Sequence, residues 1–296
     1  MKISGFTLAR NAVRLGYPLT ESLRSLLPLV DELIIALGDS DDGTEDVVLG
    51  LEADYPKIRI VRTQWEQGPD VLAVQTNLAL KECTGDWGLY LQADEVLHES
   101  ELDTIRAALE RHHTRDTEGL LFRYYHFWRY HQLEVDDYTR FYPYAVRAIR
   151  LGRGIESTGD AAGFGVRRGY SHRGLIKAYA GARVFHYGWC NPPATQAARI
   201  MNVNQIYGWK PASVAESESF GEIALKRYPG SHPALMASRI SGTEEPKEWP
   251  AQSWWPALFR AAGSAILKPR ATREWIRPVL PPILTNILWR LQKRRG

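Results

Sequence analysis

Two short acidic segments each follow an apolar run of the sequence. The segment Gly38-Asp-Ser-Asp-Asp-Gly-Thr44 follows Leu33–Leu37, and Gln92-Ala-Asp-Glu95 follows Trp87–Leu91. A carboxylate at the end of a strand can accept hydrogen bonds from ribose hydroxyls or from a base N–H. It can also bind Mg²⁺ or Mn²⁺, which prefer oxygen ligands and bridge diphosphate oxygens. Solvated turns and helix starts use the same residue types, so each segment alone leaves both interpretations open.

Asp94 is the stronger metal-ligand candidate of the two adjacent acids. Successive side chains of an extended segment point to opposite sides, so only one of Asp94 and Glu95 should face a ligand. An acidic residue near the start of the next helix accounts well for Glu95. It accounts poorly for Asp94.

The elements that must position these acids follow from hydrophobic spacing. Apolar, β-branched runs alternate with helical periodicity through the first hundred residues, and strands are expected at residues 3–9, 33–37, 58–61 and 87–91. Helices are expected from Thr44 and over Val71–Lys81. Four strand–helix units in succession predict an α/β fold with a mostly parallel sheet and helices on both faces. Ligands bind at the carboxyl ends of such strands, which selects three loops: 10–11, 38–44 and 92–95.

The rest of the chain divides into two parts. Residues 118–190 are expected to form strands and long loops, and the chain after Asn191 is expected to be helical through about Gly208. The sequence therefore predicts a ligand-binding domain over residues 1–190 and a helical extension over residues 191–296.

Composition excludes several protein classes. The 296 residues are 44% hydrophobic, and the net charge of only +3 argues against a nucleic-acid binder. Two cysteines, Cys83 and Cys190, are too few for a disulfide framework or a zinc cluster, which favours a reduced, cytoplasmic compartment. No uncharged run approaches the ~20 residues of a membrane-spanning helix, and no signal-peptide core is expected at the start.

The tail is unusually basic. Residues 246–296 contain ten Lys or Arg but only two Glu, and from Pro282 onward apolar residues recur at helical spacing. A basic, tryptophan-rich amphipathic helix suits the surface of an anionic membrane, which would make the protein peripheral on its inner face. The alternative is a helix that packs back on the main domain, with its basic last turn complementing the helix dipole.

The order of the motifs resembles family 2 glycosyltransferases of the GT-A type, particularly those of bacterial envelope-polysaccharide assembly. Arg10-Asn11 follows the first strand, Gly38–Thr44 follows the second, and Thr84-Gly-Asp-Trp-Gly-Leu-Tyr-Leu-Gln-Ala-Asp-Glu95 covers the fourth. The resemblance implies a Rossmann-like GT-A fold and a hexosyltransferase-like activity. It further implies that a nucleotide-diphosphate sugar donates its sugar to a hydroxyl of a glycan or lipid-linked acceptor, with inversion and with Mg²⁺ or Mn²⁺.

The same resemblance implies roles for individual residues. Asp94 matches the last acid of the metal motif, although Gln92 replaces its first acid, and His186 matches a downstream histidine that completes the metal site. A neutral imidazole is a competent ligand beside a carboxylate. The positions that match donor-binding residues of the family are Arg10, Asn11, Asp39, Asp42, Asn77 and Gln92.

The reaction also needs a carboxylate to take the acceptor hydroxyl's proton. Asp160 lies in a glycine-rich loop at about the family's position for this base, and Glu156 and Glu95 are its rivals. An ordinary turn residue beside Gly159 is the alternative for Asp160.

Two other functions stay open. A non-catalytic nucleotide- or glycan-binding module on the same fold is favoured by Gln92 and by Leu37-Gly38, which replace acids of the family pattern. A nucleotidyltransferase would also use a carboxylate-bound metal, but it usually has a glycine-rich basic loop after the first strand. Leu8-Ala-Arg-Asn11 contains no glycine, which argues against that class.

Overall fold

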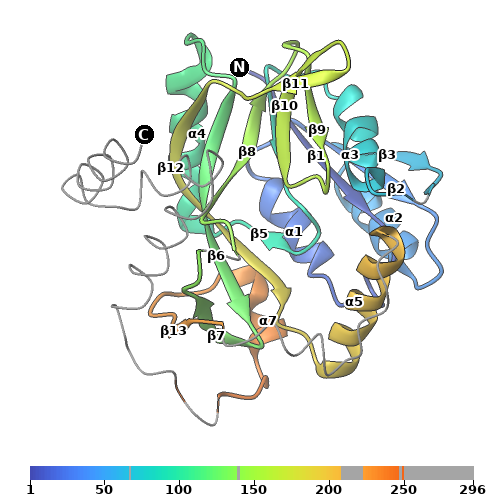
Figure 1. Cartoon of the computed structure of the whole chain (residues 1–296), viewed down its shortest axis with the longest axis vertical. Helices are drawn as coiled ribbons and strands as arrows, with labels where there is room; N and C mark the ends of the chain where they lie inside the picture. The colour runs from blue at the N-terminus through green and yellow to red at the C-terminus, as the bar shows by residue number, and fades with distance from the viewer. Residues whose placement is uncertain (67, 139–140, 208–222, 247–248, 250–296) are drawn as a thin grey trace, which may run out of the picture.

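A curled mixed sheet, flanked by helices on both faces, forms the body of the protein (Figure 1). The computed structural model describes residues 1–66, 68–138, 141–207, 223–246 and 249. The tail from residue 250 on, with its predicted amphipathic helix, lies outside the described residues. Within the described part of the chain, no helix is long and apolar enough to cross a membrane.

The first half confirms the predicted alternation of strands and helices. Its elements are β1 (Ile3–Ala9), α1 (Leu19–Leu26), β2 (Glu32–Gly38), α2 (Thr44–Asp54), β3 (Ile58–Thr63), α3 (Val71–Lys81), β4 (Trp87–Tyr90), β5 (Glu95–Val96), the 3₁₀ turn η1 (Glu99–Glu101) and α4 (Leu102–His113). The apolar strands are buried because helices cover them on both sides.

The second half is rich in strands. Its elements are β6 (Gly119–Trp128), β7 (Tyr130–Val135), β8 (Tyr144–Arg150), β9 (Ile155–Thr158), β10 (Gly163–Arg168), β11 (Ser171–Arg173), β12 (Lys177–Trp189), α5 (Pro193–Tyr207), β13 (Leu225–Arg227), the 3₁₀ turn η2 (Ala234–Met236) and α7 (Ala237–Ile240). In the described part of the chain past residue 190, β13 is the one strand, and it pairs with β7; the other elements there are α5, η2 and α7.

The sheet mixes parallel and antiparallel pairs. Among the described residues ten strands form it, with β13-β7-β6-β8-β4-β1-β2-β3 as its main path and β12 and β5 attached through β6. Strands β1 to β4 are mutually parallel, whereas β8 pairs antiparallel with both β4 and β6. The expectation of a mostly parallel sheet therefore holds for β1 to β4. Beyond them β12 also pairs parallel with β6, whereas β7 and β8 pair antiparallel with β6. Strands that follow one another without a helical crossover cannot pair in parallel.

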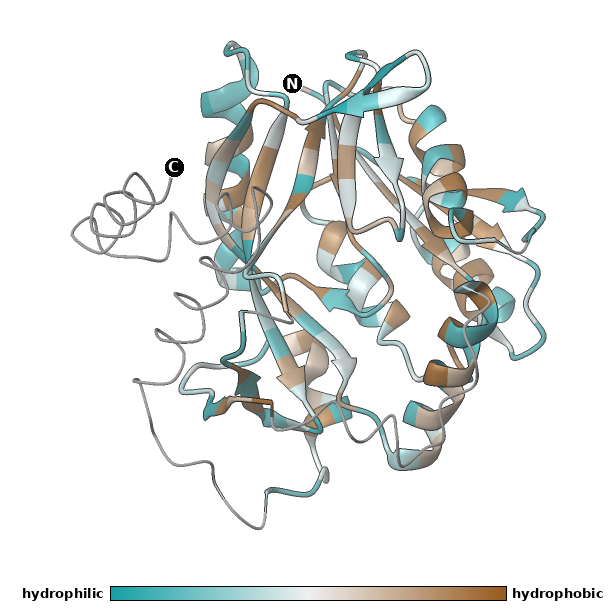
Figure 2. Ribbon diagram, viewed as in Figure 1, coloured by the Kyte–Doolittle hydropathy of each residue, from teal (hydrophilic) through white to brown (hydrophobic). Residues whose placement is uncertain are grey.

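The core has two layers separated by the sheet. On one face, helices α1, α2 and α4 pack through residues such as Leu23, Val48 and Ile105. On the other face, α3 and a three-stranded sheet of β9, β10 and β11 cover Phe6 and Tyr90. Figure 2 shows the brown, apolar strands lying between helices whose outer faces are teal. Packing on both faces of the sheet holds in place the strand ends at which the candidate site lies.

A partly buried ion pair attaches the three-stranded sheet to the main sheet. Arg173, at the end of β11, donates two hydrogen bonds to Glu118, just before β6, at 2.5 and 2.7 Å. The backbone N–H of Ile176 donates to the same carboxylate at 2.8 Å. These bonds, with Arg173 the largest cause, lower the pKa of Glu118 to about 2.

Glu118 should make stability pH-dependent in acid. Because its pKa in the folded protein lies below the ~4.3 of an unfolded glutamate, its contribution is present above that value and is lost as pH falls toward 2. Urea denaturation between pH 6 and 2 should show a smaller pH dependence for Glu118→Gln than for the wild type. The exposed control Glu110→Gln should follow the wild type. Equal slopes for all three proteins would show that this ion pair does not stabilise the fold.

Candidate active site

Asp94 and His186 meet at the carboxyl end of β4. His186 Nε2 lies 3.4 Å from Asp94 Oδ2, and a guanidinium nitrogen of Arg199, from α5, lies 2.9 Å from the same oxygen. Gly188 permits this approach, since a Cβ there would lie 2.7 Å from both Asp94 Oδ2 and His186 Nε2. Burial would raise the pKa of Asp94, but His186 and Arg199 outweigh it and hold the pKa well below its usual range. Asp94 is therefore an anion at neutral pH.

A second histidine, His126, binds the Nδ1 side of the His186 ring. His126 Nε2 lies 2.8 Å from the carbonyl oxygen of Tyr142, so this nitrogen carries the proton and donates it. Burial, aided by His186, lowers the pKa of His126 to about 3, which leaves its Nδ1 as an acceptor. His186 Nδ1 lies 3.1 Å from that acceptor and must donate. The other ring nitrogen, Nε2, is the one on the Asp94 side, and it is the one that a metal ion between the two side chains would contact.

This arrangement fits a divalent metal ion. Metal-binding histidines usually donate their second ring N–H to a fixed acceptor, as His186 does toward His126. Among the described residues no group of three or more His, Cys, Asp or Glu side chains could hold a metal alone. Asp94 and His186 supply two donors, and Mg²⁺ is commonly held by one or two carboxylates plus substrate phosphates and water.

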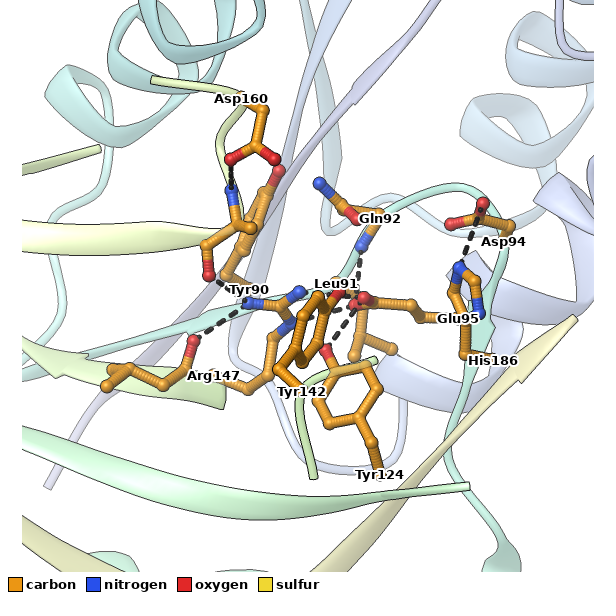
Figure 3. Close-up of polar contacts among 12 residues, drawn as sticks. Tyr90, Leu91, Gln92, Asp94, Glu95, Tyr124, Tyr142, Arg147, Asp160 and His186 are labelled. Atoms are coloured by element: carbon orange, nitrogen blue, oxygen red, sulfur yellow. Dashed lines mark hydrogen bonds and ion pairs between the residues drawn. The ribbon is translucent and has the colours of Figure 1, made fainter. Parts of the chain in front are cut away.

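Glu95 has a different role from its neighbour. Its carboxylate is fully buried and accepts hydrogen bonds from Arg147 Nε at 2.8 Å and Nη2 at 2.7 Å. The Tyr124 hydroxyl donates to it at 2.7 Å and the Gln92 backbone N–H at 3.0 Å. With four donors and no exposed surface, Glu95 cannot reach an acceptor hydroxyl (Figure 3). It holds the turn that presents Asp94.

Arg147 connects that turn to the loop of Asp160. Its Nη1 donates to the carbonyl oxygens of Val146 and Ala162, the latter two residues after Asp160. Asp160 accepts a hydrogen bond from the Ala162 N–H at 3.1 Å and is otherwise exposed. In Figure 3, Asp160 and Asp94 lie on either side of Gln92. The structure thus ties the first candidate base and the metal-ligand candidates to one buried network.

Two other candidates are engaged elsewhere. Glu156 lies on β9 and contacts Arg167 and His172, each at 3.3 Å, within the three-stranded sheet. Asn77 donates to the Ser157 carbonyl at 3.1 Å and accepts from its N–H at 2.7 Å, so its amide fastens β9 to α3. Both residues support the fold in this way, and neither contacts Asp94.

The first acidic loop presents the exposed carboxylate of Asp39 beside Arg10. Asp39 is 74% exposed at its side chain and lies 3.7 Å from Arg10 Nε, which also donates to the Asp39 carbonyl at 3.0 Å. The Arg10 guanidinium stands 5.3 Å from the centre of the Trp65 ring. Gly38 makes room for this indole, because a Cβ there would lie 2.8 Å from it. Arg10, Asp39 and Trp65 form a polar and aromatic surface suited to a nucleoside.

Asp42 and Asn11 shape that loop. Asp42 accepts hydrogen bonds from the backbone N–H groups of Arg14 at 2.7 Å and Thr44 at 3.1 Å. Asn11 adopts a positive φ of 50° and its side-chain oxygen accepts from the Asp41 N–H at 3.1 Å. Both side chains bind backbone, so they position the loop.

Comparison with known proteins identifies the family. The model described as "Glycosyl transferase family 2" matches residues 15–173, more than half of the chain. The protein belongs to glycosyl transferase family 2. The mixed α/β architecture agrees with the GT-A, Rossmann-like fold expected from the sequence. No curated protein matches the chain.

Solved structures give weaker likenesses. The chain is 21% identical to S. aureus TarS 1-349 over 43% of its own length and 36% of that chain, with a TM-score of 0.31. To TarS 1-349 in complex with UDP-GlcNAc the chain is 22% identical, over 43% of its own length and 34% of that chain, with a TM-score of 0.31. The chain therefore matches only about a third of each TarS chain, and the family assignment rests on the family model.

Four residues of this family 2 site were not predicted from the sequence. They are Arg199 beside Asp94, His126 beside His186, Arg147 beside Glu95, and Trp65 beside Arg10. Each lies more than 50 positions from its partner. The only available signal for Arg147 was an arginine within an otherwise apolar strand, at a position that strand alternation would bury.

Proposed function

We propose that the protein is an inverting, metal-assisted glycosyltransferase. It transfers a sugar from a nucleotide-diphosphate sugar to a hydroxyl of a glycan or lipid-linked acceptor. Membership of glycosyl transferase family 2 supports the reaction class. The basic, tryptophan-rich sequence of residues 246–296 supports a place at the inner surface of a membrane. A place in envelope-polysaccharide assembly rests on the resemblance of the motifs to that part of the family.

The observation that carries the proposal is the Asp94–His186 pair. A buried anion and an imidazole whose other nitrogen is bound by His126 lie at the carboxyl end of a central strand. The bound metal would neutralise charge on the departing nucleoside diphosphate. Arg199, already 2.9 Å from Asp94, adds a fixed positive charge at the same place.

The remaining steps fall to residues of the two loops. Arg10, Asp39 and Trp65 would hold the nucleoside, with the exposed carboxylate accepting from ribose hydroxyls. Asp160 takes the proton of the acceptor hydroxyl while that oxygen bonds to the anomeric carbon. The bond from that carbon to the diphosphate oxygen breaks, and the nucleoside diphosphate leaves with the electron pair. A single displacement inverts the anomeric configuration.

Release of nucleoside diphosphate from a panel of nucleotide sugars tests this function. The full chain is incubated with each sugar nucleotide and Mn²⁺ or EDTA, with water as a slow acceptor, and UDP-GlcNAc is one member of the panel. We expect Mn²⁺-dependent release from at least one donor. Binding of a donor without any release would favour the binding module. Pyrophosphate release from a nucleoside triphosphate and a sugar phosphate would identify a nucleotidyltransferase instead.

A further inference from the structure

A cavity of about 590 Å³ lies beside the Asp94–His186 pair. Its walls come from the β6–β7 hairpin, the end of β12, the first two turns of α5 and residues 242–244. The volume lies within the ~300–1,000 Å³ usual for small-molecule sites. None of the catalytic, donor-binding or metal-ligand candidates predicted from the sequence lines this cavity.

Trp189 and Arg199 connect the cavity to the metal-ligand candidates. Trp189, which lines the cavity, follows His186 by three residues on the same strand. The guanidinium carbon of Arg199 lies 5.8 Å from the centre of the Trp189 ring, and Arg199 contacts Asp94 directly. In the sheet order, the cavity at β6, β7 and β12 and the nucleoside loops at β1 and β2 lie on opposite sides of β4. A donor extending from β2 to β4 would leave this cavity to the acceptor.

The walls combine aromatic surface with an unused amide. The rings of Trp128 and Trp189 lie 5.2 Å apart, and both line the cavity. The side-chain oxygen and nitrogen of Gln196 are both buried and lack a hydrogen-bond partner in the described structure. A buried polar group without a hydrogen-bond partner is destabilising, so a ligand that pairs with it gains affinity. Gln196 lies on α5 three residues before Arg199 and lines the same cavity.

The charge of the walls selects an uncharged ligand. Arg129 and Glu244 bring one charge of each sign. Burial lowers the pKa of His131, another wall residue, to about 4, so its imidazole is neutral at neutral pH. Phosphate and carboxylate groups are usually bound by several charged donors. Aromatic faces that cover C–H groups, with an amide that can both donate and accept, suit a ring carrying hydroxyls.

We infer that this cavity binds an uncharged pyranose ring of the acceptor, with ring hydroxyls paired to the Gln196 amide. The inference rests on the proposed function, because it assigns the acceptor side of the same reaction. It narrows the acceptor to one whose receiving end is a neutral sugar. An acidic sugar or a bare phosphate does not fit these walls.

Saturation-transfer NMR with methyl glycosides tests the inference. The full chain is mixed with methyl glycosides of glucose, galactose, mannose and N-acetylglucosamine, with and without a saturating nucleoside diphosphate. We expect at least one glycoside to bind in both conditions, since the two subsites are separate. Gln196→Leu should weaken that binding at least about tenfold, the equivalent of one lost hydrogen-bonding group. It should leave release of nucleoside diphosphate to water unchanged.

The matched control is Met201→Ala, on an exposed part of α5. This variant should bind glycosides as the wild type does. The inference would be overturned if Gln196→Leu bound the glycosides as tightly as the wild type does. It would also be overturned if the wild type bound none of the four glycosides. Continued release of nucleoside diphosphate in that case would leave the proposed function intact. If the wild-type protein neither binds a glycoside nor releases nucleoside diphosphate, the proposed function is rejected as well.

Discussion

Arg147→Met is expected to lower the free energy of unfolding by about 3–5 kcal/mol, the usual cost of breaking a buried ion pair. Neither Arg147 nor Glu95 has any exposed side-chain surface, and the two are joined by two hydrogen bonds. Removing the guanidinium leaves the Glu95 carboxylate buried beside only neutral donors. The methionine also loses the contacts of the guanidinium with the rings of Tyr90 and Tyr124. Urea denaturation at neutral pH measures the change.

A double-mutant cycle separates the pair from its surroundings. Glu95→Leu combined with Arg147→Met removes both charges, so the loss should be smaller than the sum of the single losses. Arg111→Met, at an exposed position of α4, is the control and should change stability little. Additive losses in the cycle would show that the two residues do not act as a pair. The double variant should still lose transferase activity, because the turn that presents Asp94 loses its anchor.

Asp94→Asn is expected to reduce kcat for donor cleavage by about 10²-fold or more, in line with the loss of one preorganised electrostatic group. The amide keeps the shape of the side chain but removes the negative charge opposite His186 and Arg199. The release assay with Mn²⁺ measures the effect, and the melting temperature reports whether the fold survives.

Asp103→Asn is the matched control, because Asp103 is exposed in the first turn of α4, away from this edge of the sheet. It should retain wild-type turnover. Unchanged turnover in Asp94→Asn, with a folded protein, would remove Asp94 from the catalytic machinery. The carboxyl end of β4 would then not be the active site.

The sequence predicts the first half of the fold well because its signals are local. The span Ile3–Ala9 is a strand and Val71–Lys81 is a helix, as their hydrophobic patterns indicate. The second half is harder, because β12 pairs with β6 and β5 across long sequence separations. That pairing places His186 opposite Glu95 and so brings His186 near Asp94. No local pattern contains this information.

The candidate site shows the same limit. Asp39 and Asp42 are alike in the sequence, yet Asp39 is exposed whereas Asp42 binds the backbone of Arg14 and Thr44. Residue type and spacing cannot distinguish a carboxylate that binds ligand from one that holds a turn. Asn77 is a similar case, because its amide is used by Ser157 on a distant strand.

The central claim is that Asp94 and His186 bind a metal ion together with the diphosphate of the donor. Electron–nuclear double resonance of bound Mn²⁺ tests it directly, using the nucleoside diphosphate that the release assay identifies. We expect a nitrogen coupling from the His186 imidazole and phosphorus couplings from the diphosphate in the same complex. His186→Gln should lose the nitrogen coupling. Phosphorus couplings without any nitrogen coupling in the wild type would mean that His186 is not a ligand, and would contradict the account.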